Sequence, residues 1–147
     1  MRESDLWFDD HHTHAAAGVF LLTKDRRLVL QLRDDRPDID NPGKITSFGG
    51  GAERHETPVE CALRELAEET GILAEPADLL RLGTGSKLDH HGHPMALVFF
   101  LLRNVDLDAL TITEGTAVVL SFAEAAADPR LTENCRRISA QIAVEDE

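Results

Sequence analysis

The sequence predicts a mixed α/β fold, because strand patterns and helix patterns alternate along the whole chain. Residues 94–103 form a nearly all-apolar run, which is typical of a central strand buried on both faces of a sheet. Residues 58–70 form a sharply bounded helix pattern between strand patterns. No linker, repeat or low-complexity tract interrupts the 147 residues, so we expect a single domain over residues 1–147.

The first expected elements are two strands at residues 15–23 and 26–33, joined by a tight turn at Lys24 and Asp25. A loop rich in Asp, Pro and Gly follows at residues 34–44. The later strands are expected at residues 45–48, 79–88, 94–103 and 116–122, and a C-terminal helix at residues 131–144.

The helix at residues 58–70 has clear signals at both ends. Thr57 and Glu60 form a capping box, Pro58 lies in the first turn, and Gly71 ends the helix. At about 100° per residue, one side of this helix should face the core, with Val59, Ala62, Leu63, Leu66 and Thr70.

Composition limits the classes of function. The chain has 27 acidic and 15 basic residues and a net charge of −12, which argues against binding a nucleic acid polymer. No apolar run approaches the roughly 20 residues that a membrane span needs, and residues 1–10 have no signal-peptide core. We therefore expect no binding to membranes. Cys61 and Cys135 are expected to be reduced, which is typical of a cytoplasmic protein.

Glu65, Glu68 and Glu69 should gather on one side of the helix, away from its apolar side. Arg64 precedes Glu68 by four residues, so it can pair with that carboxylate without entering the cluster. Such a cluster is either a solvated acidic face or a site for a hard metal ion. Converging carboxylates repel one another, which should raise their pKa values when no metal is bound.

The stretch before the helix favours the metal site. Residues 48–56 read FGGGAERHE, a glycine-rich turn that lets backbone carbonyls approach closely, and they add Glu53 and Glu56. A glycine-rich turn followed by acids, without the lysine of a P-loop, would recruit phosphate through divalent cations.

Residues 50–72 resemble the Nudix box, G-x5-E-x7-R-E-U-x-E-E-x-G-U with U apolar, at every specified position. Gly50 and Glu56 supply the first two fixed positions, and residues 64–72 read RELAEETGI. This resemblance to the Nudix hydrolases (MutT-like) implies an α/β/α sandwich around a mixed β-sheet. It also implies hydrolysis of a nucleoside diphosphate linked to another group, with Mg²⁺ or Mn²⁺ as the cofactor.

The resemblance implies roles for individual residues. Arg64 would orient a carboxylate, and Glu56 would brace the loop or assist a second ion. The catalytic base would be Glu69 or Glu68, or Glu114 on a later loop, which could equally be a solvated turn residue. The implied metal ligands are Glu65, Glu68 and Glu69, with a backbone carbonyl at Gly49 or Gly50.

Two positions depart from the family pattern. Phe48 stands where the family usually has proline, and His55 stands where glycine is common. Neither is an implied metal ligand, but both could alter the floor of the pocket and the conformation of the loop.

The sequence indicates the substrate-binding residues less clearly than the metal ligands. Arg33 could contact a phosphate or base, or lie on the surface, and Phe48 and Phe99 are candidates for stacking. The proline typical of members acting on ADP-ribose is replaced by Lys87, and the chain has no tyrosine, which dinucleoside polyphosphate hydrolases tend to carry. A nucleoside triphosphate or related nucleotide is therefore the expected substrate by default.

Two histidine clusters, HHTH at residues 11–14 and HHGH at 90–93, flank expected strands. They could together form a zinc site, but loop histidines without a metal are the more common case. The alternative functions are a Nudix scaffold that senses a nucleotide without turnover, or an isoprenoid-diphosphate isomerase, which Cys61 inside the box helix disfavours. Residues 6–8 could pack on a second copy as a homodimer.

Overall fold

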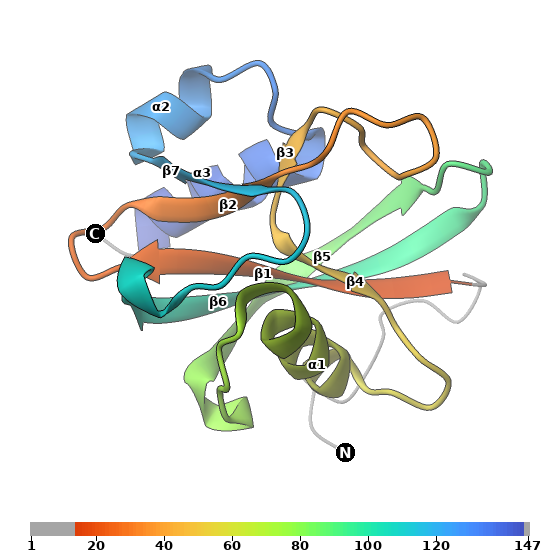
Figure 1. Cartoon of the computed structure of the whole chain (residues 1–147), viewed down its shortest axis with the longest axis horizontal. Coiled ribbons are helices and arrows are strands. Elements are labelled where there is room, and N and C mark those ends of the chain that lie inside the picture. Colours follow the sequence, from red (N-terminus) through yellow and green to blue (C-terminus); the bar gives the residue numbers. More distant parts are fainter. Residues whose placement is uncertain (1–13, 146–147) are drawn as a thin grey trace.

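The computed structural model describes residues 14–145, which form a seven-stranded mixed sheet with helices on both faces (Figure 1). Helix α1 (Pro58–Thr70) covers one face, and α2 (Phe122–Ala127) and α3 (Glu133–Glu145) lie on the other. The predicted α/β/α sandwich is confirmed. The strands are β1 (His14–Thr23), β2 (Leu28–Leu32), β3 (Ile45–Thr46), β4 (Phe48–Gly51), β5 (Leu79–Leu88), β6 (Pro94–Val105) and β7 (Thr116–Leu120), with short 3₁₀ turns η2 (Pro76–Asp78) and η3 (Leu107–Ala109).

Strand β1 separates two hydrophobic cores. Because successive side chains of a strand point to opposite faces, its buried residues divide between the two layers. Val19 and Leu21 pack in the core under α1, while Phe20 and Leu22 pack in the core with Ile138 of α3. Strand β6 runs parallel to β1 and antiparallel to β5, which confirms that the apolar run is a central strand.

The other edge of β1 is shared by two strands, and this arrangement opens the sheet. Residues 21–22 of β1 pair with β2, whereas residues 16–19 pair with β4. Strand β2 continues away from β1 and pairs with β7 along its length and with β3 at its end. The backbone of β2 and that of β4 therefore separate beside β1.

Helix α1 has the predicted bounds and caps. The hydroxyl of Thr57 accepts from the Glu60 amide, the Glu60 carboxylate accepts from the Thr57 amide, and Gly71 ends the helix with a left-handed φ of 76°. Both cysteines are free and buried, Cys61 in the core under α1 and Cys135 in the core with α3. They lie in opposite layers, so they cannot pair.

Three local expectations differ from the structure. The expected strand at 45–48 is divided at Ser47 into β3 and β4, because the chain leaves β2 and joins β1 there. The expected strand at 116–122 ends at Leu120, since Ser121 caps α2, a short helix that the sequence reading missed. The turn after β1 extends to Arg26, which adopts a φ of 62°.

We predict that Gly49→Ala destabilises the protein by at least about 2 kcal/mol, because Gly49 has a φ of 142° and an added Cβ would lie 2.0 Å from the Ala17 carbonyl oxygen. Gly51→Ala is the matched control in the same strand, since nothing lies within 4 Å of its added Cβ. It should change stability by no more than about 0.5 kcal/mol. Urea unfolding of both variants tests this, and equal losses would contradict it.

Candidate active site

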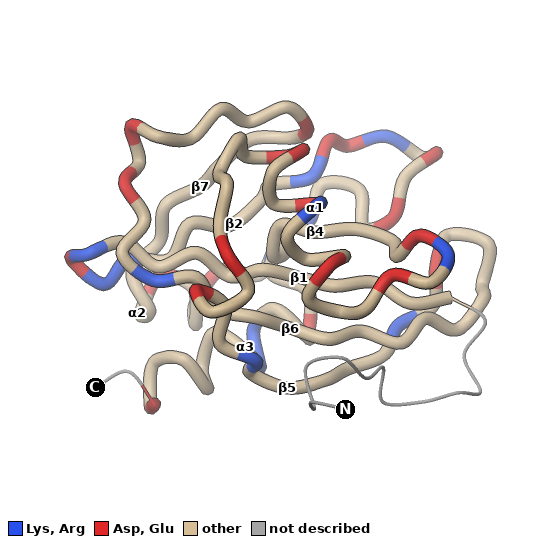
Figure 2. The backbone as a smooth tube through the Cα atoms, turned by 90° about the horizontal axis from the view of Figure 1, so that it is seen from below, with Lys and Arg blue, Asp and Glu red and all other residues tan. Residues whose placement is uncertain are grey.

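A cleft of about 610 Å³ lies beside the point where β2 and β4 separate. Its walls come from β1, β2, β3, β4, α1, β5 and β6, and from the start of α3. Acidic residues elsewhere are spread over many loops around the molecule (Figure 2). The charged side chains that line the cleft include Arg33, Glu65, Glu68, Lys87 and Glu114.

Arg64 is the centre of an ion-pair network at the start of α1. Its guanidinium donates to both carboxylate oxygens of Glu56, at 2.6 and 2.9 Å, and to the Gly51 carbonyl oxygen at 2.9 Å. It also donates to Glu65 at 3.0 Å and to Glu68 at 3.2 Å. The expected pair of Arg64 with Glu68 is therefore confirmed, but Arg64 does not stay outside the cluster, because the same guanidinium nitrogen also reaches Glu65.

This network sets the ionisation of its members. The hydrogen bond from Arg64 holds the pKa of Glu56 below its ordinary value, and the same contact raises the pKa of Arg64. Glu56 also accepts from the Glu53 amide at 2.7 Å, so it joins the loop to the helix. His55, where the family commonly has glycine, adopts a φ of 68°, so the loop keeps a conformation that favours glycine.

Glu69 is almost fully buried, with only 3% of its surface exposed. One carboxylate oxygen accepts from the Gly49 amide at 2.9 Å, and the other accepts from the side-chain amide of Gln31 at 2.8 Å. Burial raises its pKa to about 7, and these hydrogen bonds oppose the increase. The main cause of the raised pKa is therefore burial, whereas the sequence reading expected repulsion between carboxylates.

The other two carboxylates of the helix are progressively more exposed. The Glu65 side chain is 14% exposed, and burial is again the main cause that raises its pKa. The Glu68 side chain is 58% exposed and lines the cleft. The three glutamates therefore form a graded series from the protein interior to the cleft, and they do not share one solvated face.

Glu114 lies in the loop just before β7 and also lines the cleft. Its backbone carbonyl accepts from the Gln31 side chain at 3.1 Å, so Gln31 links this loop to Glu69. Thr113 in the same loop bonds to the backbone carbonyls of Glu68 and Glu69. The loop therefore has a fixed position next to the acidic cluster, although the catalytic role of Glu114 stays a prediction.

On the substrate side, Arg33 lines the cleft and donates to the Asp40 carbonyl oxygen at 3.2 Å. Phe48 and Phe99 are among the residues that line the cleft, but the Phe48 side chain is fully buried in the core under α1, so its stacking on a substrate stays a prediction. Phe99 is also largely buried, and it packs edge-on against Phe20.

Sequence reasoning missed Gln31, which holds the buried carboxylate. The sequence feature that could have indicated it is a single amide side chain inside the otherwise apolar strand LVLQL. In the structure, Gln31 is only 1% exposed. The ion pair between Lys87 and Asp40, at 3.5 Å across the far end of the cleft, was missed as well.

The sequence profile described as "NUDIX domain" matches residues 12–141. The chain belongs to the Nudix family. Proteins of this family typically depend on a divalent metal ion. Within residues 14–145, no helix is long and apolar enough to cross a membrane.

The comparisons with individual Nudix proteins agree on the fold. The structure is similar to a MutT protein from Methanosarcina mazei Go1, with a TM-score of 0.74 and 18% identity over 91% of this chain and 95% of that one. The structure is also similar to a C. elegans Ap4A hydrolase complex, with a TM-score of 0.71 and 15% identity over 90% of this chain and 97% of that one. An ADP-ribose pyrophosphatase from Methanocaldococcus jannaschii is 32% identical over 91 residues, which are 61% of this chain. The chain spans about half (52%) of the length of that relative.

The residues of the Nudix box fit a hard divalent cation. Carboxylate and backbone carbonyl oxygens are the ligands that Mg²⁺ and Mn²⁺ prefer. Glycine at position 50 leaves space for the acidic side chain behind it, since an added Cβ would lie only 2.7 Å from the Glu65 carboxylate atoms. Arg64 offsets only part of the charge of Glu56, Glu65 and Glu68, so a cation in the cluster would be stabilising.

We predict that the metal-free protein loses stability as the pH rises from about 4.5 to about 7. The pKa of Glu69 is about 7 in the folded protein, against 4.5 for an ordinary glutamate, so folding favours its protonated form. That contribution is complete below about pH 4.5 and is lost as the pH passes 7. The Glu69→Gln variant cannot ionise there, so it should lack this fall and be more stable than wild type at pH 8.

At pH 8 the free energy of unfolding of the two proteins should differ by no more than a few kcal/mol, because each unit of pKa shift corresponds to about 1.4 kcal/mol. Urea unfolding at pH 5 and pH 8 with a chelator measures it. The prediction is wrong if wild type and Glu69→Gln change equally between the two pH values.

Proposed function

We propose that the protein is a divalent-metal-dependent pyrophosphohydrolase that cleaves a nucleoside diphosphate linked to another group. One observation carries the proposal: Glu65 and Glu68 line an open cleft beside the glycine backbone of β4, and the buried Glu69 behind them accepts from the Gly49 amide of the same strand. A non-catalytic acidic surface would not need a buried carboxylate held by two hydrogen bonds.

The chain's own residues would hold the metal and the substrate. Glu65, Glu68 and Glu69 would be the metal ligands, with a backbone carbonyl of Gly49 or Gly50. When bound, Mg²⁺ or Mn²⁺ would neutralise the pyrophosphate oxygens and acidify a water molecule. Arg64 would orient Glu65 and Glu68, to which it already donates hydrogen bonds.

Proton transfer needs a carboxylate that faces the cleft. Glu68 and Glu114 both line it, and both are exposed. Glu69 has a pKa near 7, which suits a general base, but both of its oxygens already accept hydrogen bonds. We therefore favour Glu68 or Glu114 as the base and assign Glu69 to metal binding.

The preferred substrate is a nucleoside triphosphate or a related nucleotide. Arg33 and Lys87 line the cleft and could contact the phosphates or the base. ADP-ribose is a second candidate, supported by the 32% identity to the ADP-ribose pyrophosphatase. Against it, Lys87 stands where members acting on ADP-ribose tend to carry proline.

The rival function is a Nudix module that binds a nucleotide without turnover. It is disfavoured because both glutamates of the Glu68-Glu69 pair are present and one of them is buried and hydrogen-bonded. We further propose one Nudix domain over residues 1–147 and a cytoplasmic location. The proposed homodimer contact at residues 6–8 lies outside the described residues.

The test is a panel of nucleoside triphosphates, ADP-ribose and dinucleoside polyphosphates with Mg²⁺ or Mn²⁺. We expect Glu69→Gln and Glu68→Gln to lower turnover by orders of magnitude while nucleotide affinity stays within about tenfold. Glu60→Gln is the matched control on the same helix, since it is exposed and glutamine preserves the capping box. It should keep wild-type turnover.

Two outcomes would overturn the proposal. If no compound of the panel is hydrolysed although one binds, the protein is the binding module. If Glu69→Gln and Glu60→Gln have equal turnover, the reaction does not depend on the acidic cluster. If the wild-type protein is active, an equal loss of turnover in Glu114→Gln and Glu68→Gln would mean that these two residues share the metal or base role.

A further inference from the structure

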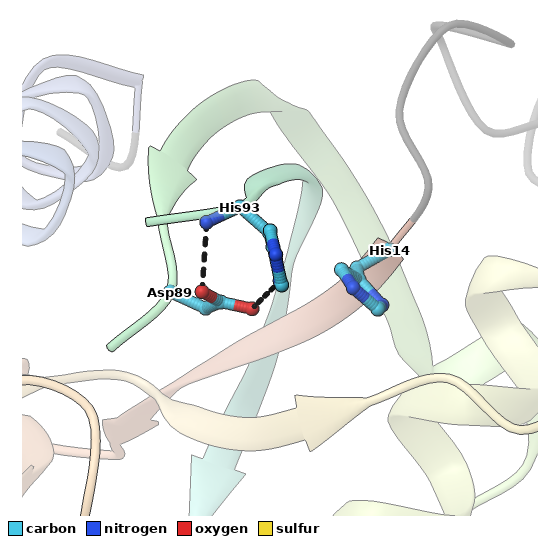
Figure 3. Close-up of side chains that lie close together, drawn as sticks. All are labelled: His14, Asp89 and His93. Atoms are coloured by element: carbon cyan, nitrogen blue, oxygen red, sulfur yellow. Dashed lines mark hydrogen bonds and ion pairs between the residues drawn. The ribbon is translucent and has the colours of Figure 1, made fainter. Parts of the chain in front are cut away.

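A second group of metal-ligating side chains lies at the other end of β1. His14 is the first residue of β1, and Asp89 and His93 lie in the turn between β5 and β6 (Figure 3). One ligand atom from each of these three residues lies within 4.8 Å of the other two. None of the three belongs to the Nudix box at residues 50–72.

The backbone brings these residues together. Because β1 and β6 are parallel and His14 pairs with Met95, the start of β1 lies next to the end of the turn. The turn closes through two backbone hydrogen bonds, from the Asp89 amide to the His93 carbonyl and from the Gly92 amide to the Asp89 carbonyl, both at 2.9 Å. Gly92 adopts a φ of 81°, which favours glycine.

Asp89 is already oriented for binding a cation. One of its oxygens accepts from the backbone amides of His91 and His93, at 2.8 and 2.9 Å. The other oxygen lies 3.5 Å from Nδ1 of His93. The Asp89 side chain is 13% exposed, so the carboxylate is fixed while the two histidine rings remain accessible.

The rings of His14 and His93 lie side by side, with centroids 5.6 Å apart (Figure 3). Ligand atoms bound at about 2.0–2.2 Å to one tetrahedral ion lie roughly 3.3–3.6 Å from one another. Both histidines are exposed at the surface, so modest rotations of their side chains would bring the three ligand atoms to that separation. The remaining positions on the ion would face water.

We propose that His14, Asp89 and His93 form a binding site for a divalent transition-metal ion such as Zn²⁺. Two imidazoles with one carboxylate favour Zn²⁺ and similar ions, whereas Mg²⁺ prefers a set of oxygen ligands. This site is therefore chemically distinct from the acidic cluster of the Nudix box and would not compete with it for Mg²⁺.

The ion would join the start of β1 to the β5–β6 turn. That turn is also held at the main cleft, because Asp40 accepts from the His90 backbone and ring, at 2.9 and 2.7 Å, and lies 3.5 Å from Lys87 Nζ. Lys87 lines the cleft. Binding would thus add a cross-link to the turn that directly follows the end of β5, where Lys87 lies.

The test is calorimetric titration of the full chain with Zn²⁺ in millimolar Mg²⁺, which fills the acidic cluster with its preferred ion. Wild type should bind one more equivalent of Zn²⁺ than His93→Ala or His14→Ala. Asp89→Asn should lower the affinity for that additional Zn²⁺ ion by about tenfold or more. Zn²⁺ should also raise the melting temperature of wild type more than that of His93→Ala.

Two controls separate this site from a general affinity of histidines for zinc. His91→Ala removes an exposed histidine of the same turn that is not one of the three ligands. The double variant His11→Ala/His12→Ala removes the two histidines that precede the described residues. Both control variants should bind as many Zn²⁺ ions per chain as wild type. All variants should have the melting temperature of wild type when a chelator is present.

The proposal is overturned if wild type binds no more Zn²⁺ than His93→Ala. It is equally overturned if either control loses as much binding as His93→Ala, since the metal would then be held by a diffuse histidine surface. The result is independent of the proposed hydrolysis, because Mg²⁺-dependent turnover is measured separately and should be the same in His93→Ala and wild type.

Discussion

The buried carboxylate of Glu69 is the contact on which the geometry of the site depends. Its two hydrogen bonds connect helix α1 to the backbone of β4 at Gly49 and to the side chain of Gln31 in β2. These are the two strands that separate from each other beside β1. One side chain therefore fixes the helix relative to both walls of the cleft, and Gln31 extends this link to the loop of Glu114.

Burying a carboxylate is costly unless hydrogen bonds or charges compensate for lost water. At Glu69 two neutral donors compensate only in part, which is why its pKa rises to about 7. At Glu56 the charged guanidinium of Arg64 more than compensates, so the pKa of that carboxyl falls. The site thus combines one strongly ionised carboxylate that holds the loop with a buried one whose ionised form a bound cation would favour.

Much of this arrangement could be predicted from the sequence, because the strongest signals are local. The caps of α1 and the apolar run of β6 depend on neighbouring residues or on simple periodicity, and both were predicted correctly. The spacing of the Nudix box identified the family that the profile match confirms. The acidic cluster was predicted as a set, but not the different burial of its three members.

The errors concern contacts between distant segments. Phe48 was considered only as a stacking residue, and the sequence did not indicate that β4 pairs with β1 in a register that buries its ring in the core under α1. The partnership of Gln31 with Glu69 spans 38 positions, and no local pattern encodes it. The proximity of His14 to His93 likewise follows from the parallel pairing of β1 with β6, which the sequence alone did not specify.

The central claim is that the acidic cluster of α1 and the glycine backbone before it form a binding site for a catalytic divalent ion. Anomalous diffraction from crystals soaked in Mn²⁺ tests it most directly. We predict a manganese peak in contact with carboxylate oxygens of Glu65, Glu68 and Glu69 and with a backbone carbonyl of Gly49 or Gly50. A well-ordered cluster with no manganese peak, or manganese bound only at His14, Asp89 and His93, would contradict it.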